Sequence, residues 1–268
     1  MDEVLTWTTL VVLIAGFVSG VLASILGVGG AVITTPLIRF LGASPIASVG
    51  STVPAILPGA LAGSLRYHRE GYIVWRVALT CGLTGMAFAI LGGWVAGIVD
   101  ARWLLVLTGF LVIWSGAALL REGLRHTPEV IEPDTESDLP AGEIRGGTAA
   151  MVALGVVGGF LAGLLGIGGG LILTPGFNLG LRLPVKSAIA TSLAAVAMMS
   201  TTAAATHIAL GHVDWRFALP LAIGIVPGAR VGARVTVGSS EHTMRILSGS
   251  LLIVIAIILL AKELPGLL

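Results

Sequence analysis

Two short stretches of this sequence combine glycine, threonine and proline in a pattern that could bind an anion. The first reads Gly27-Val28-Gly29-Gly30 and is followed by Thr35-Pro36; the second reads Gly166-Ile167-Gly168-Gly169 and is followed by Thr174-Pro175. Each stretch interrupts a hydrophobic run and carries no charge. A helix that starts at such a break presents N–H groups without intrahelical partners and the positive end of its dipole. A small anion is the ligand that this helix start favours.

Hydroxyl side chains that follow each stretch add further hydrogen-bond donors. The substrate-binding residues that we predict are Gly29, Gly30, Thr35, Ser51, Thr52, Gly168, Gly169, Thr174, Thr191 and Ser192. Thr52 and Thr191 are favoured among the hydroxyls because they match when the two halves of the chain are aligned. The alternative is structural: the glycines allow close helix packing, and the hydroxyls bond to carbonyls of their own or neighbouring helices.

Three ionisable residues are candidates for gating or anion steering, namely His68, His207 and Arg230. The two histidines match between the halves and are predicted near opposite faces of a membrane, and histidine titrates near neutral pH. Arg230 has no basic counterpart in the first half, and an intramembrane charge is a functional candidate by default. The alternatives are structural histidines near the membrane surface and an arginine whose head group reaches the cytoplasmic side.

The ionisable residues that are missing also narrow the function. All 14 acidic residues are expected in loops or at the ends of hydrophobic segments. A carboxylate proton relay, a divalent-cation site and metal-dependent hydrolysis therefore lack their usual groups. The single cysteine, Cys81, excludes an internal disulfide or a Cys-x-x-Cys site. We expect no metal, no cofactor, no catalytic residue and no nucleic-acid partner.

Composition sets the class of protein that carries these residues. Of 268 residues, 56% are hydrophobic and only 11% are charged, and the mean hydropathy is +1.01. Soluble domains carry about a quarter charged residues, and apolar runs of about 18 or more residues recur along this chain. The sequence predicts an all-α polytopic membrane protein whose first hydrophobic run, from about Trp7, is retained as a membrane span.

An internal duplication organises the chain. With a shift of 139 residues, Gly20, Gly27, Gly29, Gly30, Thr35, Pro36, Pro45, Ser48, Thr52 and His68 fall on Gly159, Gly166, Gly168, Gly169, Thr174, Pro175, Pro184, Ser187, Thr191 and His207. From Trp75-Arg76 onward the shift is 140. We predict a membrane repeat at 1–121, a hydrophilic linker at 122–145 and a second membrane repeat at 146–268.

Basic residues predict how the two repeats are oriented, because they favour the cytoplasmic side. With both termini outside, eleven of the 15 basic residues are cytoplasmic and four (Arg39, Arg102, Arg216 and Lys262) are outside. The repeats are then inverted in topology and the linker 122–145 is cytoplasmic. Each repeat is predicted to hold a glycine-broken helical hairpin and three spanning helices. The hairpins cross the membrane fully or return from a re-entrant tip; both readings fit the charges.

The repeated pattern Gly20-x6-Gly27-x-Gly29-Gly30-x5-Pro36, followed by Ser51-Thr52, resembles the sulfite exporter TauE/SafE family. The resemblance covers nearly the whole chain, including its length, its duplication and its central hydrophilic loop. It implies a plasma-membrane secondary transporter that exports a small anion, such as sulfite or an organosulfur acid, by alternating access. An anion channel and a membrane scaffold without transport are the alternatives, and a homodimer is left open.

Overall fold

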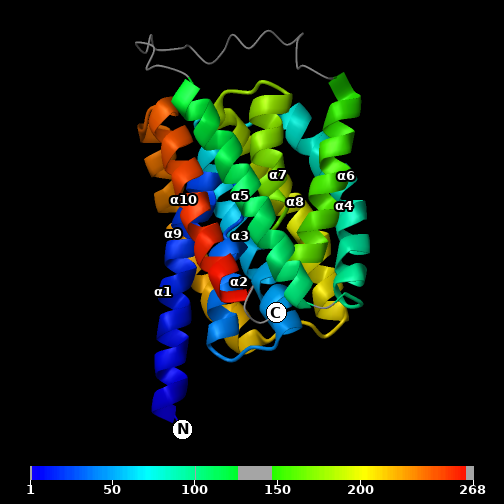
Figure 1. Cartoon of the computed structure of the whole chain (residues 1–268), viewed down its shortest axis with the longest axis vertical. Coiled ribbons are helices and arrows are strands. Elements are labelled where there is room, and N and C mark those ends of the chain that lie inside the picture. Colours follow the sequence, from blue (N-terminus) through cyan, green and yellow to red (C-terminus); the bar gives the residue numbers. More distant parts are fainter. Residues whose placement is uncertain (1, 100, 126–146, 264–268) are drawn as a thin grey trace.

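The computed structural model describes residues 2–99, 101–125 and 147–263, and the secondary structure in these ranges is helical (Figure 1). The elements are α1 (Asp2–Leu26), α2 (Ala31–Phe40), α3 (Pro45–Arg69), α4 (Trp75–Ala96), α5 (Ala101–Arg125), α6 (Gly147–Leu165), α7 (Gly170–Pro175), the π-helix η2 (Gly176–Gly180), α8 (Val185–Ala209), α9 (Trp215–Gly238) and α10 (Glu241–Glu263).

Six helices among the described residues, α1, α3, α4, α6, α8 and α9, are long and apolar enough to cross a membrane. Large apolar side chains such as Leu83, Trp94 and Ile223 are exposed on the outside of the bundle. Exposed apolar surface on this scale is what lipid contact requires. The predicted class, an all-α polytopic membrane protein, is confirmed.

Some predicted boundaries differ in the structure. The six qualifying helices include the first arms of both hairpins, α1 and α6, whereas the described parts of α5 and α10 contain only shorter apolar stretches, Val106–Arg121 and His242–Val254. Helix α5 continues to Arg125, so the first four residues assigned to the linker 122–145 are helical. Most of that linker, from residue 126, lies outside the described residues.

The second arms of both hairpins are too short to cross a membrane. One arm is helix α2, with 10 residues; the other consists of α7, with 6 residues, and η2, with 5 residues. At 1.5 Å per residue each arm reaches about 15 Å, half of the hydrocarbon thickness. Of the two readings that the sequence leaves open, the structure therefore favours hairpins that turn back inside the bundle.

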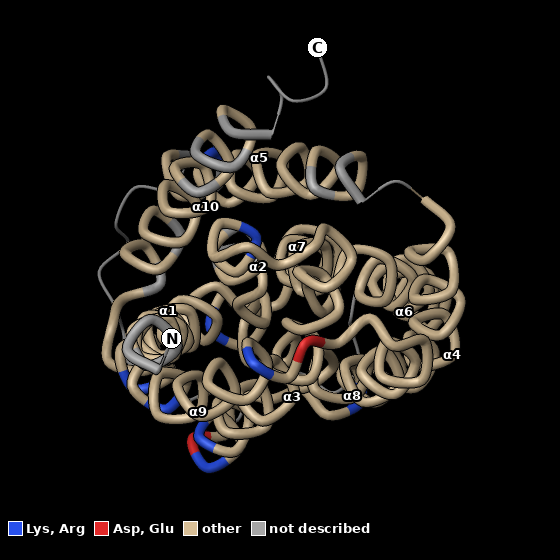
Figure 2. The backbone as a smooth tube through the Cα atoms, turned by 90° about the horizontal axis from the view of Figure 1, so that it is seen from below, with Lys and Arg blue, Asp and Glu red and all other residues tan. Residues whose placement is uncertain are grey.

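The helices surround the hairpin arms in a fixed order (Figure 2). Viewed along the bundle, α2 and α7 lie in the middle, with α1 and α9 on one side and α4 and α6 on the other. Helices α3 and α8 cover one face of the middle pair, and α5 and α10 cover the opposite face. The hairpins are thus enclosed by helices from both halves of the chain.

The main helix pairs all join one half of the chain to the other. Helix α1 packs on α9 and α6 packs on α4, while α3 pairs with α8 and α5 with α10. The duplication equates α1 with α6 and α4 with α9, so these pairs map onto one another. Helix α5 ends and α6 begins at one end of the bundle, and α1 begins and α10 ends at the other (Figure 1). This arrangement supports inverted repeats, which stay a prediction.

Glycine makes the cross-half pairs close. A methyl group added at Gly20 of α1 would contact the carbonyl oxygen of Ile225 on α9, and one added at Gly159 of α6 would contact the carbonyl oxygen of Gly85 on α4. In lipid, where apolar burial does not drive helices together, association depends on such close backbone packing. Gly20 and Gly159 therefore allow close helix packing, which is the structural role that the sequence leaves open for glycines.

We expect Gly159→Ala to lower the free energy of unfolding by about 1–3 kcal/mol, because the added methyl overpacks the α4–α6 contact. Thermal unfolding of the purified protein in detergent measures this. Gly238→Ala is the matched control, since nothing lies within 4 Å of a methyl group there. Equal stability of the two variants would contradict the packing assignment.

Candidate binding site at the hairpin tips

The two glycine stretches form tips that only glycine fits well. Gly27, Gly29 and Gly30 have φ values of 70°, 83° and 89°. Gly166, Gly168 and Gly169 repeat this with 68°, 77° and 75°. Side chains rarely adopt this left-handed backbone, whereas glycine does so at little cost. The spacing Gly-x-Gly-Gly thus encodes the same turn twice, between α1 and α2 and between α6 and α7.

The structure brings the two tips together. A methyl group at Gly27 would lie 2.7 Å from Thr174 Oγ1, and one at Gly170 would touch the carbonyl oxygen of Gly27. Gly29 and Gly168 both face the side chains of Ile56 and Val196. The tips of the two halves therefore meet inside the bundle, at a place lined by backbone, hydroxyl and apolar groups.

The last turn of α1 ends inside the protein, so its carbonyl groups need partners there. Tyr67 Oη donates to Ser24 O at 2.6 Å, and Ser248 Oγ donates to Ile25 O at 3.4 Å. Thr174 Oγ1 lies 3.2 Å from Leu26 O and 3.3 Å from Gly27 O, and Ser192 Oγ donates to Gly27 O at 2.9 Å. Val28 N closes the turn onto Ala23 O at 3.2 Å.

The end of α6 is satisfied by the equivalent groups of the first half and by a histidine. Thr52 Oγ1 lies 3.3 Å from Gly166 O, and His207 Nε2 lies 2.9 Å from Gly163 O. Three predicted substrate ligands, Thr52, Thr174 and Ser192, therefore bond to the hairpin of the opposite half. The sequence leaves two roles open for these hydroxyls, and bonding to carbonyls of neighbouring helices is the structural one.

These contacts correct the alignment of the two halves over α3 and α8. Tyr67 bonds to Ser24 O in the first half as His207 bonds to Gly163 O in the second. Tyr67 is therefore the counterpart of His207, and the sequence match of His68 with His207 is wrong by one residue. His68 instead accepts a hydrogen bond from Trp75 Nε1 at 3.3 Å, in an exposed contact.

The change of register means that the second half has one more residue than the first before α8, and this inserted residue lies in η2. Leu41 N bonds to Leu37 O, four residues back, whereas the equivalent Leu181 N bonds to Gly176 O, five residues back. A π-turn of this kind accommodates one inserted residue without breaking the helix. The shift of 140 therefore begins before α8, earlier than the sequence predicted.

With this register, different hydroxyl residues of α3 and α8 become equivalent. Thr52 matches Ser192, and both bond to the opposite hairpin tip. Ser51 matches Thr191, and both accept an N–H from a loop: Ser51 Oγ from Asp214 N at 2.8 Å and Thr191 Oγ1 from Val74 N at 3.0 Å. An accepted N–H leaves the hydroxyl hydrogen of Ser51 and Thr191 out of that bond.

Two predicted residues take other positions. Thr35 Oγ1 lies 3.4 Å from Thr52 Oγ1 and so joins the tip network. The side chain of Arg230 is on the exposed face of α9, so the structure does not bring it to the tips. The helix that carries Arg230 turns its Gly228 and Gly232 toward α1, which leaves the arginine facing outward.

The sequence interpretation missed two residues, one beside the hairpin tips and one in contact with the predicted gating residue His207. Ser200 on α8 is fully buried and its hydroxyl has no hydrogen-bond partner among the described residues. It lies 3.7 Å from the position of a methyl group at Gly168. The corrected register aligns Ser200 with Ala60, so the residue is polar in one half only. His212, in the loop before α9, is the second.

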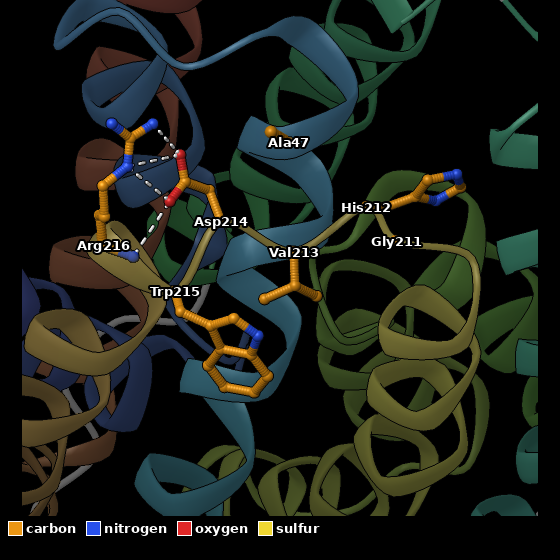
Figure 3. Close-up of a pocket in the computed structure, with 7 residues that line it drawn as sticks. All are labelled: Ala47, Gly211, His212, Val213, Asp214, Trp215 and Arg216. Atoms are coloured by element: carbon orange, nitrogen blue, oxygen red, sulfur yellow. Dashed lines mark hydrogen bonds and ion pairs between the residues drawn. The ribbon is translucent and has the colours of Figure 1, made fainter.

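A surface cleft of about 460 Å³ lies at the end of the bundle where α9 begins. It is lined by Ala47, Gly211, His212, Val213, Asp214, Trp215 and Arg216 (Figure 3). Asp214 caps α9 and pairs with Arg216 at 2.7 Å, and this hydrogen-bonded pair lowers the pKa of Asp214. The ring of His212 lies on the other side of Val213 from this ion pair.

Within the described ranges, no group of three or more His, Cys, Asp or Glu side chains could hold a metal ion. The tip region consists of backbone groups, hydroxyls and the apolar side chains Ile56 and Val196. Such a region can position a ligand through hydrogen bonds.

A bundle of apolar helices around two broken hairpins defines a multi-pass membrane protein of the transporter class. The family model described as "Sulfite exporter TauE/SafE" matches residues 12–259. The chain belongs to the sulfite exporter TauE/SafE family. The resemblance in the sequence is confirmed.

Relatives carry transporter names. The chain is 26% identical over 247 residues to a "Probable membrane transporter protein" of Xylella fastidiosa, with 91% of each chain covered. It is 25% identical over 266 residues to "Probable membrane transporter protein YunE" of Bacillus subtilis, covering 91% of this chain and 94% of the relative. A Sinorhizobium relative, "Probable membrane transporter protein ORF9", is 29% identical over 250 residues, covering 92% and 90%. No solved structure matches the chain significantly. These names indicate a membrane transporter.

The two hydroxyls on Gly27 O should compensate for each other. We expect Ser192→Ala or Thr174→Val alone to cost about 1 kcal/mol of unfolding free energy, because the other donor remains. The double variant should cost more than the sum, since Gly27 O then loses both donors. Thermal unfolding of all four proteins in detergent measures the coupling, and strictly additive costs would exclude a shared acceptor.

Proposed function

We propose that this protein is a secondary transporter that moves a small anion by alternating access, and that sulfite or an organosulfur acid is the substrate. The observation that carries the proposal is the meeting of two uncharged glycine tips beside a buried, unpartnered hydroxyl. In our proposal the backbone N–H groups of Gly29, Gly30, Gly168 and Gly169 line the anion site.

The side-chain donors follow from the hydrogen bonds. Thr174 and Ser192 use their hydroxyl hydrogens on carbonyls at the end of α1. Thr52 Oγ1 lies 2.8 Å from Val49 O on its own helix and 3.3 Å from Gly166 O, so its hydrogen is also used within the protein. In this state none of the three hydroxyls donates to an anion. Ser51 and Thr191 accept hydrogen bonds from loop N–H groups, which leaves their own hydrogens for a ligand. Ser200 adds a free donor next to Gly168. Anion donors in this proposal are therefore Ser51, Thr191 and Ser200.

The charge of the region supports an anion over a cation. A buried cation needs carboxylates or several carbonyl oxygens as ligands. At the tips, the carbonyl oxygens of Gly27 and Gly166 already accept hydrogen bonds from hydroxyls, and no acidic side chain is among the contacts of the tip glycines. The hydroxyl hydrogens of Ser51, Thr191 and Ser200 remain as donors, and donors stabilise negative charge.

The paired arrangement of the halves supports alternating access. The same contacts occur twice between the halves: Thr52 holds the second tip and Ser192 the first, while Thr191 holds the loop before α4 and Ser51 the loop before α9. A site between two such halves could open toward either end by exchange of these contacts. We place the protein in the plasma membrane, with both termini outside and export as its direction.

The experiment is anion flux in proteoliposomes with a panel of sulfite, sulfonates, thiosulfate, mercapto-acids and inorganic anions. We expect saturable counterflow of at least one sulfur-containing anion. Flux that does not saturate, together with single-channel currents in a planar bilayer, would contradict a carrier. No movement of any anion on the panel would overturn the proposal and favour a membrane scaffold.

Ser200→Ala tests the site itself. We expect the KM for the transported anion to rise about 10- to 100-fold, because a hydrogen bond to a charged group contributes about 1.5–3 kcal/mol. Stability should not fall, since the hydroxyl has no partner to lose. The matched control is Ser115→Ala on α5, whose hydroxyl is also fully buried and unpartnered. An unchanged KM in Ser200→Ala would remove Ser200 from the site.

A further inference from the structure

Two histidines are in direct contact between the interior of the bundle and the surface cleft. His207, near the end of α8, is fully buried, and its Nδ1 lies 3.2 Å from Nδ1 of His212. The ring centroids are 5.3 Å apart. His212 belongs to the loop that lines the cleft (Figure 3). The contact therefore connects the cleft to a residue that holds the end of α6.

The hydrogen bonds assign the tautomers of the neutral pair. Gly163 O can only accept, so Nε2 of His207 carries a hydrogen and its Nδ1 does not. Nδ1 of His207 is then the acceptor in the histidine contact, and Nδ1 of His212 must carry the hydrogen that it donates. Nε2 of His212 is left as the site where a proton can bind.

The same geometry limits the pair to one added proton. A proton on Nε2 of His212 keeps both hydrogen bonds and creates an imidazolium next to the cleft. A second proton, on Nδ1 of His207, would place two N–H groups 3.2 Å apart and break their contact. The pair thus exists in a neutral and a singly charged state.

Few other charges face the pair. Helix α4 contributes Gly93 and Gly97, α6 contributes Gly163, and α3 contributes Gly50. In the loop and at the start of α9, Asp214 and Arg216 are paired with each other. Burial lowers the pKa of His212, so its proton binds below the ordinary histidine value of about 6.5.

Among the described residues of the first half, no such pair is found. Tyr67 takes the place of His207 and holds Ser24 O, and Tyr72 takes the place of His212. A tyrosine hydroxyl donates without titrating near neutral pH. The proton-binding pair therefore exists at one end of the molecule only, the end where α1 begins and α10 ends.

We propose that His207 and His212 form the proton site that couples anion movement to protons entering from the cleft. The proposal rests on the transport function proposed above and names its coupling ion. A proton on Nε2 of His212 places one positive charge beside the path of an anion. His207 connects that charge to the last turn of α6, which leads directly into the Gly166 tip.

The first test needs no substrate. Nitrogen-15 NMR of histidine-labelled full-length protein in detergent can assign the signals, because the chain has only 5 histidines and single His→Gln variants identify each. We expect Nε2–H on His207, Nδ1–H on His212, and a titration of His212 that changes in His207→Gln. Two Nε2–H tautomers, or a His212 titration that His207→Gln leaves unchanged, would overturn the proposal.

The second test separates coupling from transport. In proteoliposomes loaded with labelled sulfite, counterflow is followed without a pH gradient, and efflux is followed into an acidic medium about one unit below the ordinary histidine pKa. We expect His207→Gln and His212→Gln to reduce gradient-driven efflux about 5- to 100-fold, the range of a coupling free energy of 1–3 kcal/mol, and to retain counterflow. His68→Gln, whose side chain contacts Trp75, is the control and should retain both.

The outcomes are distinguishable. Gradient-driven efflux that survives in both histidine variants overturns the coupling proposal and leaves the transport function standing. Absence of sulfite counterflow in the unmodified protein counts against sulfite as the substrate, and the NMR result still decides whether the pair exists. Equal losses in His68→Gln would also overturn the proposal, because that histidine contacts Trp75 and not the pair.

Discussion

The structure depends on how two helices end inside an apolar bundle. The carbonyl groups in the last turns of α1 and α6 cannot reach water, and each unsatisfied group in such a place costs several kcal/mol. Side chains from other helices supply the missing hydrogen bonds: Tyr67, Thr174 and Ser192 for α1, and Thr52 and His207 for α6. Most of these donors come from the opposite half, so the two hairpins are completed only when both halves are folded together.

Close backbone contact adds to this mutual dependence. The glycine-rich faces of α1 and α6 pack on α9 and α4, and a methyl group at Gly20 or Gly159 would meet backbone of the other half. Hydrogen bonding and close packing therefore act across the same interface. Each half therefore supplies packing surface and hydrogen-bond donors to the hairpin of the other.

The two halves use equivalent positions with different chemistry. Tyr67 and His207 hold matching carbonyls, yet only the histidine can change its charge near neutral pH. Ser200 is a buried free hydroxyl where the first half has Ala60. These substitutions give the two ends of the molecule different chemistry on equivalent positions of the fold.

The sequence by itself determined the class, the duplication and the two glycine turns. A run of apolar residues predicts a membrane helix from its own composition. A left-handed turn requires glycine at the residues that form it. Both features are therefore local in the sequence. Only the tertiary structure decided what the hydroxyls contact across the two halves, because Ser192 bonds to Gly27 O, 165 residues away, and Thr52, which also bonds to Val49 O in its own helix, reaches Gly166 O. It also decided the register of α3 and α8, since the inserted residue is absorbed by a π-turn that composition does not reveal. The His207–His212 contact depends on that register and on the loop before α9. For this reason the sequence alone matched His207 with His68 and did not indicate His212.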